Sequence, residues 1–300
     1  MKKEDGTTRL APILERVVYC LLGAAGIIAT LMFAQLLSSL GVFGRPVAAE
    51  AVPAPSAIAV KEAPMVAALT DEEIGVIYIS AKREAGEGQE EARKNRGYIS
   101  PIVFGRLQVI NKDVYAWISI AGTTIDYPIL QHPTDRSKYL NYKIDGSYGR
   151  PGCIYTENTN SLDFSDNNTV IYGHNMKNGT MFADLHKFRK REFFNENREI
   201  IIYLPDRELH YEIFAAYIYD DRHLMDSFYF AHPSVYASYL KGVFDNKDMG
   251  AIINRNMTVT KNDRIITLST CVRGQDSKRL LVQAVLTNPE ALTKAGYPQT

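Results

Sequence analysis

The sequence predicts a mainly β fold, a barrel or a sandwich, with helices before the strands and a helical insertion among them. About eight short segments rich in Ile, Val, Tyr and Thr recur after residue 114, which is typical of such folds. Helical spacing of apolar residues is confined to a few segments before or between them. A charge-free stretch and then an Ala- and Pro-rich stretch come first, so the folded part is expected to begin near residue 70.

The composition is that of an ordinary folded protein with balanced charge. The 300 residues carry 34 Lys and Arg against 34 Asp and Glu, so the formal net charge is zero. Nothing in this balance attracts nucleic acid, and three cysteines are too few for a scaffold built on disulfides. The chain has no HExxH, CxxC, Walker A or GxGxxG motif, so we expect neither a metal nor a cofactor.

Residues 17–43 contain no charged residue and predict a transmembrane helix, because about 20 apolar residues span a bilayer. Basic residues gather on its N-terminal side: Lys2, Lys3, Arg9 and Arg16. The positive-inside rule then predicts a single-pass protein of the cell membrane, with residues 1–16 in the cytoplasm and the remainder outside. The alternative is a cleaved signal peptide ending at residues 47–49, whose apolar core is usually about 7–15 residues long.

The rest of the chain divides into three parts. Residues 44–69 form a linker rich in Ala and Pro, which is expected to hold the following domain away from the membrane. Residues 70–288 form the extracellular domain, and residues 289–300 form a C-terminal tail.

Two helices are predicted at the start of the domain. Thr70 with Glu73 three residues later fits a capping box, so a helix begins there and runs toward Arg83 or Asn95. Residues 101–111 carry apolar residues at helical spacing and predict a second helix.

Short strands follow from residue 114 onward. Alternating or apolar runs bounded by turn residues predict strands at 115–120, 124–130, 152–156, 169–172, 200–204, 209–217, 264–270 and 279–286. Helical segments are predicted between strands at 181–189 and 233–244.

Cys271 ends an apolar strand and precedes a polar loop over residues 273–278, so its thiol is placed to be exposed. Alternation puts it on the same face as Ser269 and Thr267. A thiol of this kind can act as a nucleophile when a base stands nearby, although most free cysteines are packing residues. Cys153 is expected to be a packing residue, and Cys20 in the predicted membrane segment is a candidate site for palmitoylation.

His174 is the best candidate for that base among six histidines, since it directly follows a strand and stands beside Gly173. His210 lies in a strand pattern, and surface positions are predicted for the remaining four: His132, His186, His223 and His232. Arg279 opens the last strand and points away from the core face, where it could donate hydrogen bonds to an oxyanion. A solvated or ion-paired arginine is the plain alternative.

These residues carry a resemblance to a known family. Thr-Leu-Ser-Thr-Cys at 267–271, followed by Lys-Arg at 278–279 and an apolar strand, resembles the signature of sortases. Tyr-Gly-His-Asn-Met at 172–176 resembles their histidine motif. The segments 117–118, 122–131 and 138–140, and the long segment 220–262, resemble class B sortases.

The resemblance implies a closed sortase-type barrel of about eight strands, with a helical insertion before the seventh, preceded by one transmembrane helix. It also implies a membrane-anchored cysteine transpeptidase of Gram-positive bacteria. Such an enzyme cleaves a sorting motif near the C-terminus of a secreted protein through a thioacyl-enzyme, then transfers the acyl group to an amine of a cell-wall precursor, lipid-linked peptidoglycan. Its partners are therefore those two substrates and the lipid bilayer, and no cofactor is needed.

The same resemblance assigns roles residue by residue. Cys271 becomes the nucleophile, His174 the general acid and base, and Arg279 the stabiliser of the oxyanion or of the substrate backbone. The substrate groove would be lined by four further residues: Ser269, Thr270, Tyr172 and Leu140. Val272 stands where class B members often have an acidic residue, and residues 220–225 do not align with the family's motif-reading segment.

Two other classes of function fit the same residues. A secreted cysteine protease or amidase would use the same thiol and imidazole for hydrolysis without transfer. A non-enzymatic, surface-anchored β domain would leave Cys271 unreactive.

Overall fold

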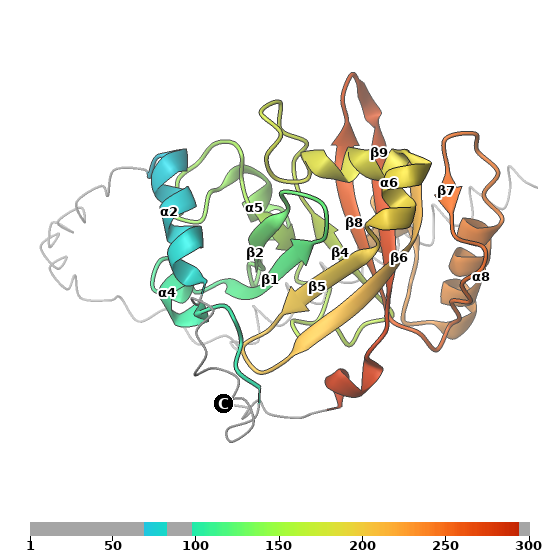
Figure 1. Ribbon diagram of the computed structural model, residues 1–300, viewed down its shortest axis with the longest axis horizontal. Helices are drawn as coiled ribbons and strands as arrows, with labels where there is room; N and C mark the ends of the chain where they lie inside the picture. The colour runs from blue at the N-terminus through green and yellow to red at the C-terminus, as the bar shows by residue number, and fades with distance from the viewer. Residues whose placement is uncertain (1–68, 83–97, 294–300) are drawn as a thin grey trace, which may run out of the picture. The chain divides into compact units, whose positions relative to one another are not determined.

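The structure is a computed structural model that describes residues 69–82 and 98–293 (Figure 1). The predicted cytoplasmic segment and membrane helix lie outside the described residues, as do all but the last residue of the linker and the end of the tail. Within the described ranges, no helix is both long enough and apolar enough to cross a membrane.

The domain opens with the predicted capping box. The Thr70 hydroxyl accepts a bond from the Glu73 amide at 3.2 Å, and the Glu73 carboxylate accepts one from the Thr70 amide at 2.7 Å. This starts helix α2, Asp71–Ala81. The second helix, α4, Phe104–Gln108, is shorter than predicted. Both helices share a core with the early strands, and this core includes the buried Trp117.

The predicted barrel is confirmed, because the sheet closes on itself. The strands are β1 Val114–Ile120, β2 Asp126–Leu130, β3 Ile154–Thr156, β4 Asn168–Tyr172, β5 Glu199–Tyr203, β6 Glu208–Asp220, β7 Ile252–Ile253, β8 Ile265–Val272 and β9 Gln275–Leu286. Their order is β5-β1-β2-β3-β4-β8-β9-β6-β7, and β5 also pairs with β6, which closes the ring. The two-residue β7 lies outside the ring, paired with β6, so eight strands form the barrel.

Alternation along β8 and β9 divides their side chains between two faces, as the sequence predicts, and the structure adds that both faces pack into a core. Ile266 and Leu268 join the cluster inside the barrel, together with Leu280 of β9. Ile265 and Leu281 face the other way, into a second cluster. Strands buried on both faces in this way hold their ends in fixed positions.

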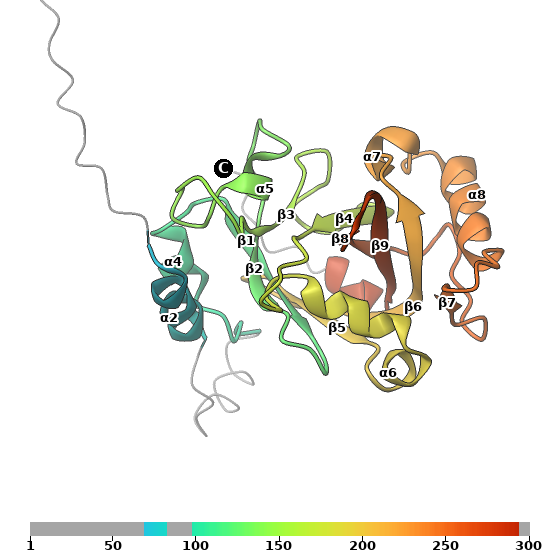
Figure 2. The same ribbon diagram turned by 90° about the horizontal axis from the view of Figure 1, so that it is seen from above.

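The predicted helical insertion before the seventh barrel strand, which is β8, is confirmed. It contains α7, Leu224–Ser227, and α8, Pro233–Phe244, which covers the outer face of β6 (Figure 2). Proline at the first turn of α8 suits a position whose amide would have no helical partner. The remaining short helices are α5 Lys138–Asn141, η1 Ala183–Arg189, α6 Arg191–Glu196 and η2 Pro289–Leu292.

The predicted polar loop after Cys271 is wrong. The chain instead makes a tight turn at Arg273 and Gly274 and re-enters the sheet at Gln275, with Val272 opposite Gln275. Gly274 has a φ of +74°, a conformation that favours glycine. Residues 275–278 are exposed, so they show no alternation that would mark them as strand.

Candidate active site

A groove with a cavity volume of about 340 Å³ lies at the ends of β4, β8 and β9. Strand pairing brings its residues together. β4 runs parallel to β8 with Tyr172 opposite Ser269, so the residues after β4 lie beside the end of β8. β9 runs antiparallel to β8 with Arg279 directly opposite Cys271. Cys271, His174 and Arg279 all line this groove, as do the four predicted lining residues: Ser269, Thr270, Tyr172 and Leu140.

The two described cysteines differ sharply in environment. Both are free, but Cys271 is exposed and Cys153 is buried. Burial raises the pKa of Cys153, and its thiol donates to the carbonyl of Tyr142 at 3.3 Å. Cys153 is therefore a packing residue held as a thiol, as the sequence predicts, and Cys271 is the accessible sulfur.

His174 is half-buried and oriented by the backbone. Its Nε2 donates to the carbonyl of Leu140 at 2.8 Å, which leaves Nδ1 as the nitrogen that can accept a proton. Burial lowers the pKa of His174, an effect partly opposed by the Leu140 carbonyl. The imidazole is thus held in one tautomer and favours the neutral, basic form.

Gly173 allows the chain to approach the barrel closely just before His174. A Cβ atom at this position would lie 2.5 Å from Cδ1 of Ile154 and 2.7 Å from Cδ2 of Phe182. The Thr270 hydroxyl donates to the Gly173 carbonyl at 2.8 Å, and the Gly173 amide donates to the carbonyl of Ser269 at 3.2 Å. Thr270 lines the groove as predicted, but its hydroxyl is bonded to the backbone of Gly173, directly before His174.

Arg279 stands in β9 directly before the part of this strand that is buried in the barrel, so core packing fixes its backbone position. Its neighbours Leu280 and Leu281 are fully buried on opposite faces of β9. Nη1 of Arg279 donates to the carbonyls of Asp276 and Lys278 at 2.7 and 3.0 Å. The Cα of Arg279 lies opposite that of Cys271, and these two backbone bonds hold its guanidinium, which favours Arg279 as a pre-positioned donor.

Two residues that sequence reasoning missed hold the backbone of Cys271. The Cys271 carbonyl lies 3.1 Å from Nδ2 of Asn175 and 3.1 Å from Nε2 of His186. The prediction of a surface position for His186 is wrong, since it is half-buried and burial lowers its pKa. The only feature of the sequence that could have indicated Asn175 is its place directly after His174. No feature of the sequence indicated His186.

The lining of the groove also includes a pair of polar residues that the sequence did not reveal. Glu157, which follows β3, and His223, which precedes α7, both line the groove and bind each other. His223 was predicted to be a surface residue, but it is half-buried and packs against Tyr172 with 5.9 Å between ring centroids.

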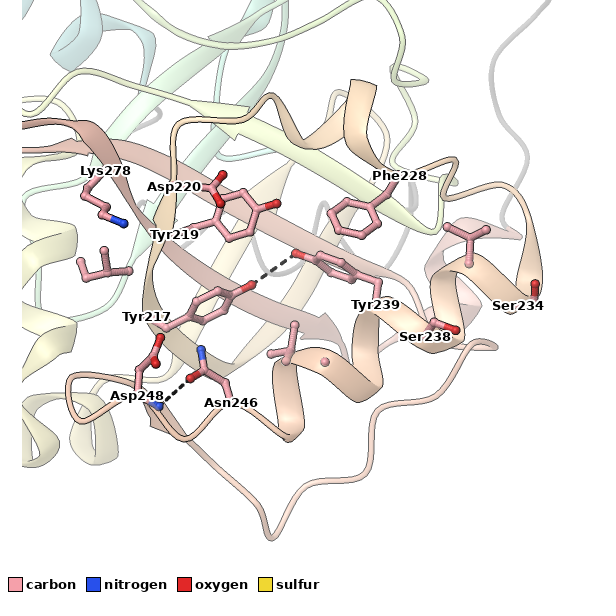
Figure 3. Close-up of a pocket in the computed structure, with 14 residues that line it drawn as sticks. Tyr217, Tyr219, Asp220, Phe228, Ser234, Ser238, Tyr239, Asn246, Asp248 and Lys278 are labelled. Carbon is pink, nitrogen blue, oxygen red and sulfur yellow. Dashed lines mark hydrogen bonds between the residues drawn. The ribbon is translucent and has the colours of Figure 1, made fainter. Parts of the chain in front are cut away.

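A larger hollow of about 610 Å³ lies between β6 and α8 (Figure 3). It is lined by aromatic rings, among them Tyr217 and Tyr239, whose hydroxyl groups lie 3.4 Å apart. Tyr219 lines both hollows. The residues lining the larger one include neither Cys nor His, so the chemistry points to the smaller groove. Within the described part of the chain, no group of three His, Cys, Asp or Glu side chains is arranged to hold a metal ion.

Comparison with known proteins agrees with this geometry. The family model described as the Sortase domain matches residues 118–287, more than half of the chain. The chain belongs to the sortase family. Sortase B of Listeria monocytogenes is 36% identical over 186 residues, covering 60% of this chain and 72% of that protein.

Solved structures place this sortase in class B. The crystal structure of Clostridium perfringens sortase B has a TM-score of 0.55 and 32% identity, covering 61% of this chain and 98% of that one. The Staphylococcus aureus sortase B–substrate complex has a TM-score of 0.57 and 28% identity, covering 72% and 93%. Class B sortases are cysteine transpeptidases, and this sortase is an enzyme of that type.

Proposed function

We propose that this sortase cleaves a C-terminal sorting motif of secreted proteins and transfers the acyl part to an amine of a cell-wall precursor. The observation that carries the proposal is the exposed Cys271 at a strand end, directly opposite Arg279 in register, with His174 in the same groove. An exposed thiol beside a neutral imidazole provides a nucleophile and its base.

The reaction follows from these three side chains. His174 takes the thiol proton, and the sulfur of Cys271 attacks the scissile carbonyl carbon to form a tetrahedral oxyanion, to which Arg279 donates. The C–N bond then breaks, and His174 returns its proton to the leaving amine. An incoming amine attacks the thioester while His174 accepts its proton, and the thiolate of Cys271 is released.

The groove would hold the peptide on either side of the thiol. Leu140 offers an apolar surface and is about one-third exposed, while Tyr172 also lines the groove, with its ring stacked on Tyr155. Ser269 is nearly buried, so it contributes to the groove floor. These are the residues that we expect to contact the sorting peptide.

The test uses the full-length protein in detergent micelles. Peptides of the Asn-Pro-x-Thr and Pro-Pro-x-Thr types are supplied with and without an added amine, and products are identified by mass. Transfer predicts a covalent acyl adduct on Cys271 and an amide product that appears only with the amine. Hydrolysis alone in the presence of amine would favour a protease or amidase. An unmodified, slowly alkylated Cys271 would favour a non-enzymatic domain.

We also propose that residues 17–43 anchor this enzyme in the cell membrane with the catalytic domain outside. Support comes from the absence of charge in this segment and the basic residues before it. Protease added to intact protoplasts should release an active fragment by cutting within residues 44–69. Full-length protein in the culture medium would contradict the anchor, and a mature chain beginning near residue 50 would support the cleaved signal peptide.

A further inference from the structure

Glu157 is a buried carboxylate in the wall of the proposed substrate groove. It directly follows β3, and only 7% of its side chain is exposed. An ionised carboxylate removed from water is costly unless charged or hydrogen-bonding partners surround it. The identity and the origin of those partners therefore indicate what the residue does.

Both carboxylate oxygens of Glu157 are occupied. Oε2 accepts from both Nε and Nη2 of Arg136, at 3.0 and 2.7 Å, so two charge-assisted hydrogen bonds converge on one oxygen. Oε1 lies 2.6 Å from Nε2 of His223. One carboxylate thus binds two side chains that come from separate segments of the chain.

Asp226 closes the group from the solvent side. Its Oδ1 lies 3.1 Å from Nη2 of Arg136, and its Oδ2 lies 3.2 Å from Nδ1 of His223. Each ring nitrogen of His223 therefore faces a carboxylate, and Nη2 of Arg136 also lies 3.3 Å from Nδ1 of His223. We name these four residues the Glu157 clamp: Arg136, Glu157, His223 and Asp226.

The clamp joins three places that are far apart in sequence. Arg136 lies between β2 and α5, Glu157 follows β3, and His223 with Asp226 belongs to the insertion between β6 and β7. The insertion also supplies residues 221–224 to the wall of the groove. His223 is additionally stacked on Tyr172, the last residue of β4 and two residues before His174.

We propose that the Glu157 clamp fastens residues 221–224 against the barrel and thereby sets how tightly the enzyme binds the sorting peptide. Glu157 is then a positioning residue, because it acts through the wall that it holds. The consequence for peptide affinity depends on the function proposed above, whereas the fastening of the wall does not. A rigid wall binds a peptide more tightly than a mobile one, since less ordering remains to be done on binding.

The first experiment measures the fastening in the full-length protein. Glu157→Gln keeps the shape of the side chain but replaces the oxygen facing either Arg136 or His223 with an amide nitrogen. The matched control is Glu212→Gln, which breaks the ion pair with Arg198 at 3.1 Å, a pair outside the groove. Amide hydrogen exchange in residues 221–228 should be about tenfold faster in Glu157→Gln, a change of about 1.4 kcal/mol, and unchanged in the control. Equal exchange in both variants would overturn the clamp.

The second experiment measures the consequence. In Glu157→Gln we expect KM for the sorting peptide to rise about tenfold, with kcat at saturating peptide and the alkylation rate of Cys271 within about twofold of wild type. Arg136→Gln should raise KM similarly, and the double variant should add little, because both changes break one unit. A fall in kcat and alkylation with an unchanged KM would overturn the proposal, since Glu157 would then act on the nucleophile.

The two readouts keep the proposals separate. If the wild-type enzyme cleaves no sorting peptide, the proposed function fails, and hydrogen exchange alone decides whether Glu157 fastens the wall. If wild type cleaves peptide but Glu157→Gln shows neither faster exchange nor a higher KM, the clamp fails and the proposed function stands.

Discussion

The close packing at Gly173 gives the sharpest prediction, because the histidine segment has no room for a single added methyl group. In Gly173→Ala, the new Cβ would meet Ile154 at 2.5 Å and Phe182 at 2.7 Å, both well inside ordinary contact distance. Overpacking of this kind costs about 1–3 kcal/mol. The strain is relieved most simply by moving residues 173 and 174 outward, which displaces His174 from the Leu140 carbonyl that orients it.

Two measurements check this prediction. The midpoint temperature of thermal unfolding should drop by about 2–4 °C for each kcal/mol of stability lost. The rate of acylation by a sorting peptide should fall about 10²-fold, since small displacements of a catalytic group have effects of that size. Gly242→Ala is the control, because a Cβ there meets nothing within 4 Å and the residue lies in α8, where alanine is favoured.

A second substitution makes the reasoning refutable. Ile154→Val removes the Cδ1 atom that lies nearest the new methyl group, so the double variant Gly173→Ala/Ile154→Val should recover part of the lost stability and rate. Recovery should be incomplete because Phe182 stays in place. Wild-type stability and acylation in Gly173→Ala alone would show that the segment is not held as the structure indicates.

The remaining predictions concern the three side chains to which we assign the proposed chemistry. Cys271→Ala should abolish both cleavage and transfer in the peptide assay, and residual turnover at the wild-type rate would refute its role. His174→Ala should lose about 10²–10⁴-fold in turnover, whereas His210→Ala should change it little; the reverse order would reassign the base. Arg279→Lys keeps the charge but loses the planar fork, so acylation should fall about 10²–10³-fold, and Arg273→Ala should act normally in the same measurement. Burial lowers the pKa of His174, so the unfolded chain binds its proton more readily than the folded one. The contribution of neutral His174 to folding stability is fully present above the ordinary pKa range of histidine and declines as pH falls through that range. In urea titrations between pH 8 and pH 5, the free energy of unfolding should therefore decline less steeply for His174→Gln than for wild type.

Strand alternation made much of the fold predictable. β8 and β9 are buried on both faces within the barrel, and their apolar residues mark them clearly in the sequence. The same alternation placed Cys271 and Arg279 on the groove side of their strands. Residues 275–278 were missed because a strand that projects into solvent needs no apolar face, so nothing in the side-chain pattern separates it from a loop.

The wall of the groove could not be predicted for a different reason. Glu157 and His223 are 66 residues apart in sequence, and each alone resembles an ordinary polar surface residue. His186 reaches the carbonyl of Cys271 across 85 residues. Contacts of this kind exist only after the barrel has closed, so the spacing of residues within a short stretch of sequence cannot predict them. Asn175 is the exception, since it stands next to His174 in the motif itself.

The parallel pairing of β4 with β8 has a consequence for the time at which the enzyme becomes reactive. Thr270 and Gly173, which this pairing joins, are 97 residues apart, and the intervening chain includes β5, β6 and the whole insertion. Pairing across so long a loop is costly in chain entropy and tends to form late in folding. A chain still being synthesised would present His174 well before Cys271 arrives beside it. The thiol of Cys271 and the imidazole of His174 would therefore meet only as the last strands dock, so the proposed catalytic pair would form when the protein is nearly complete.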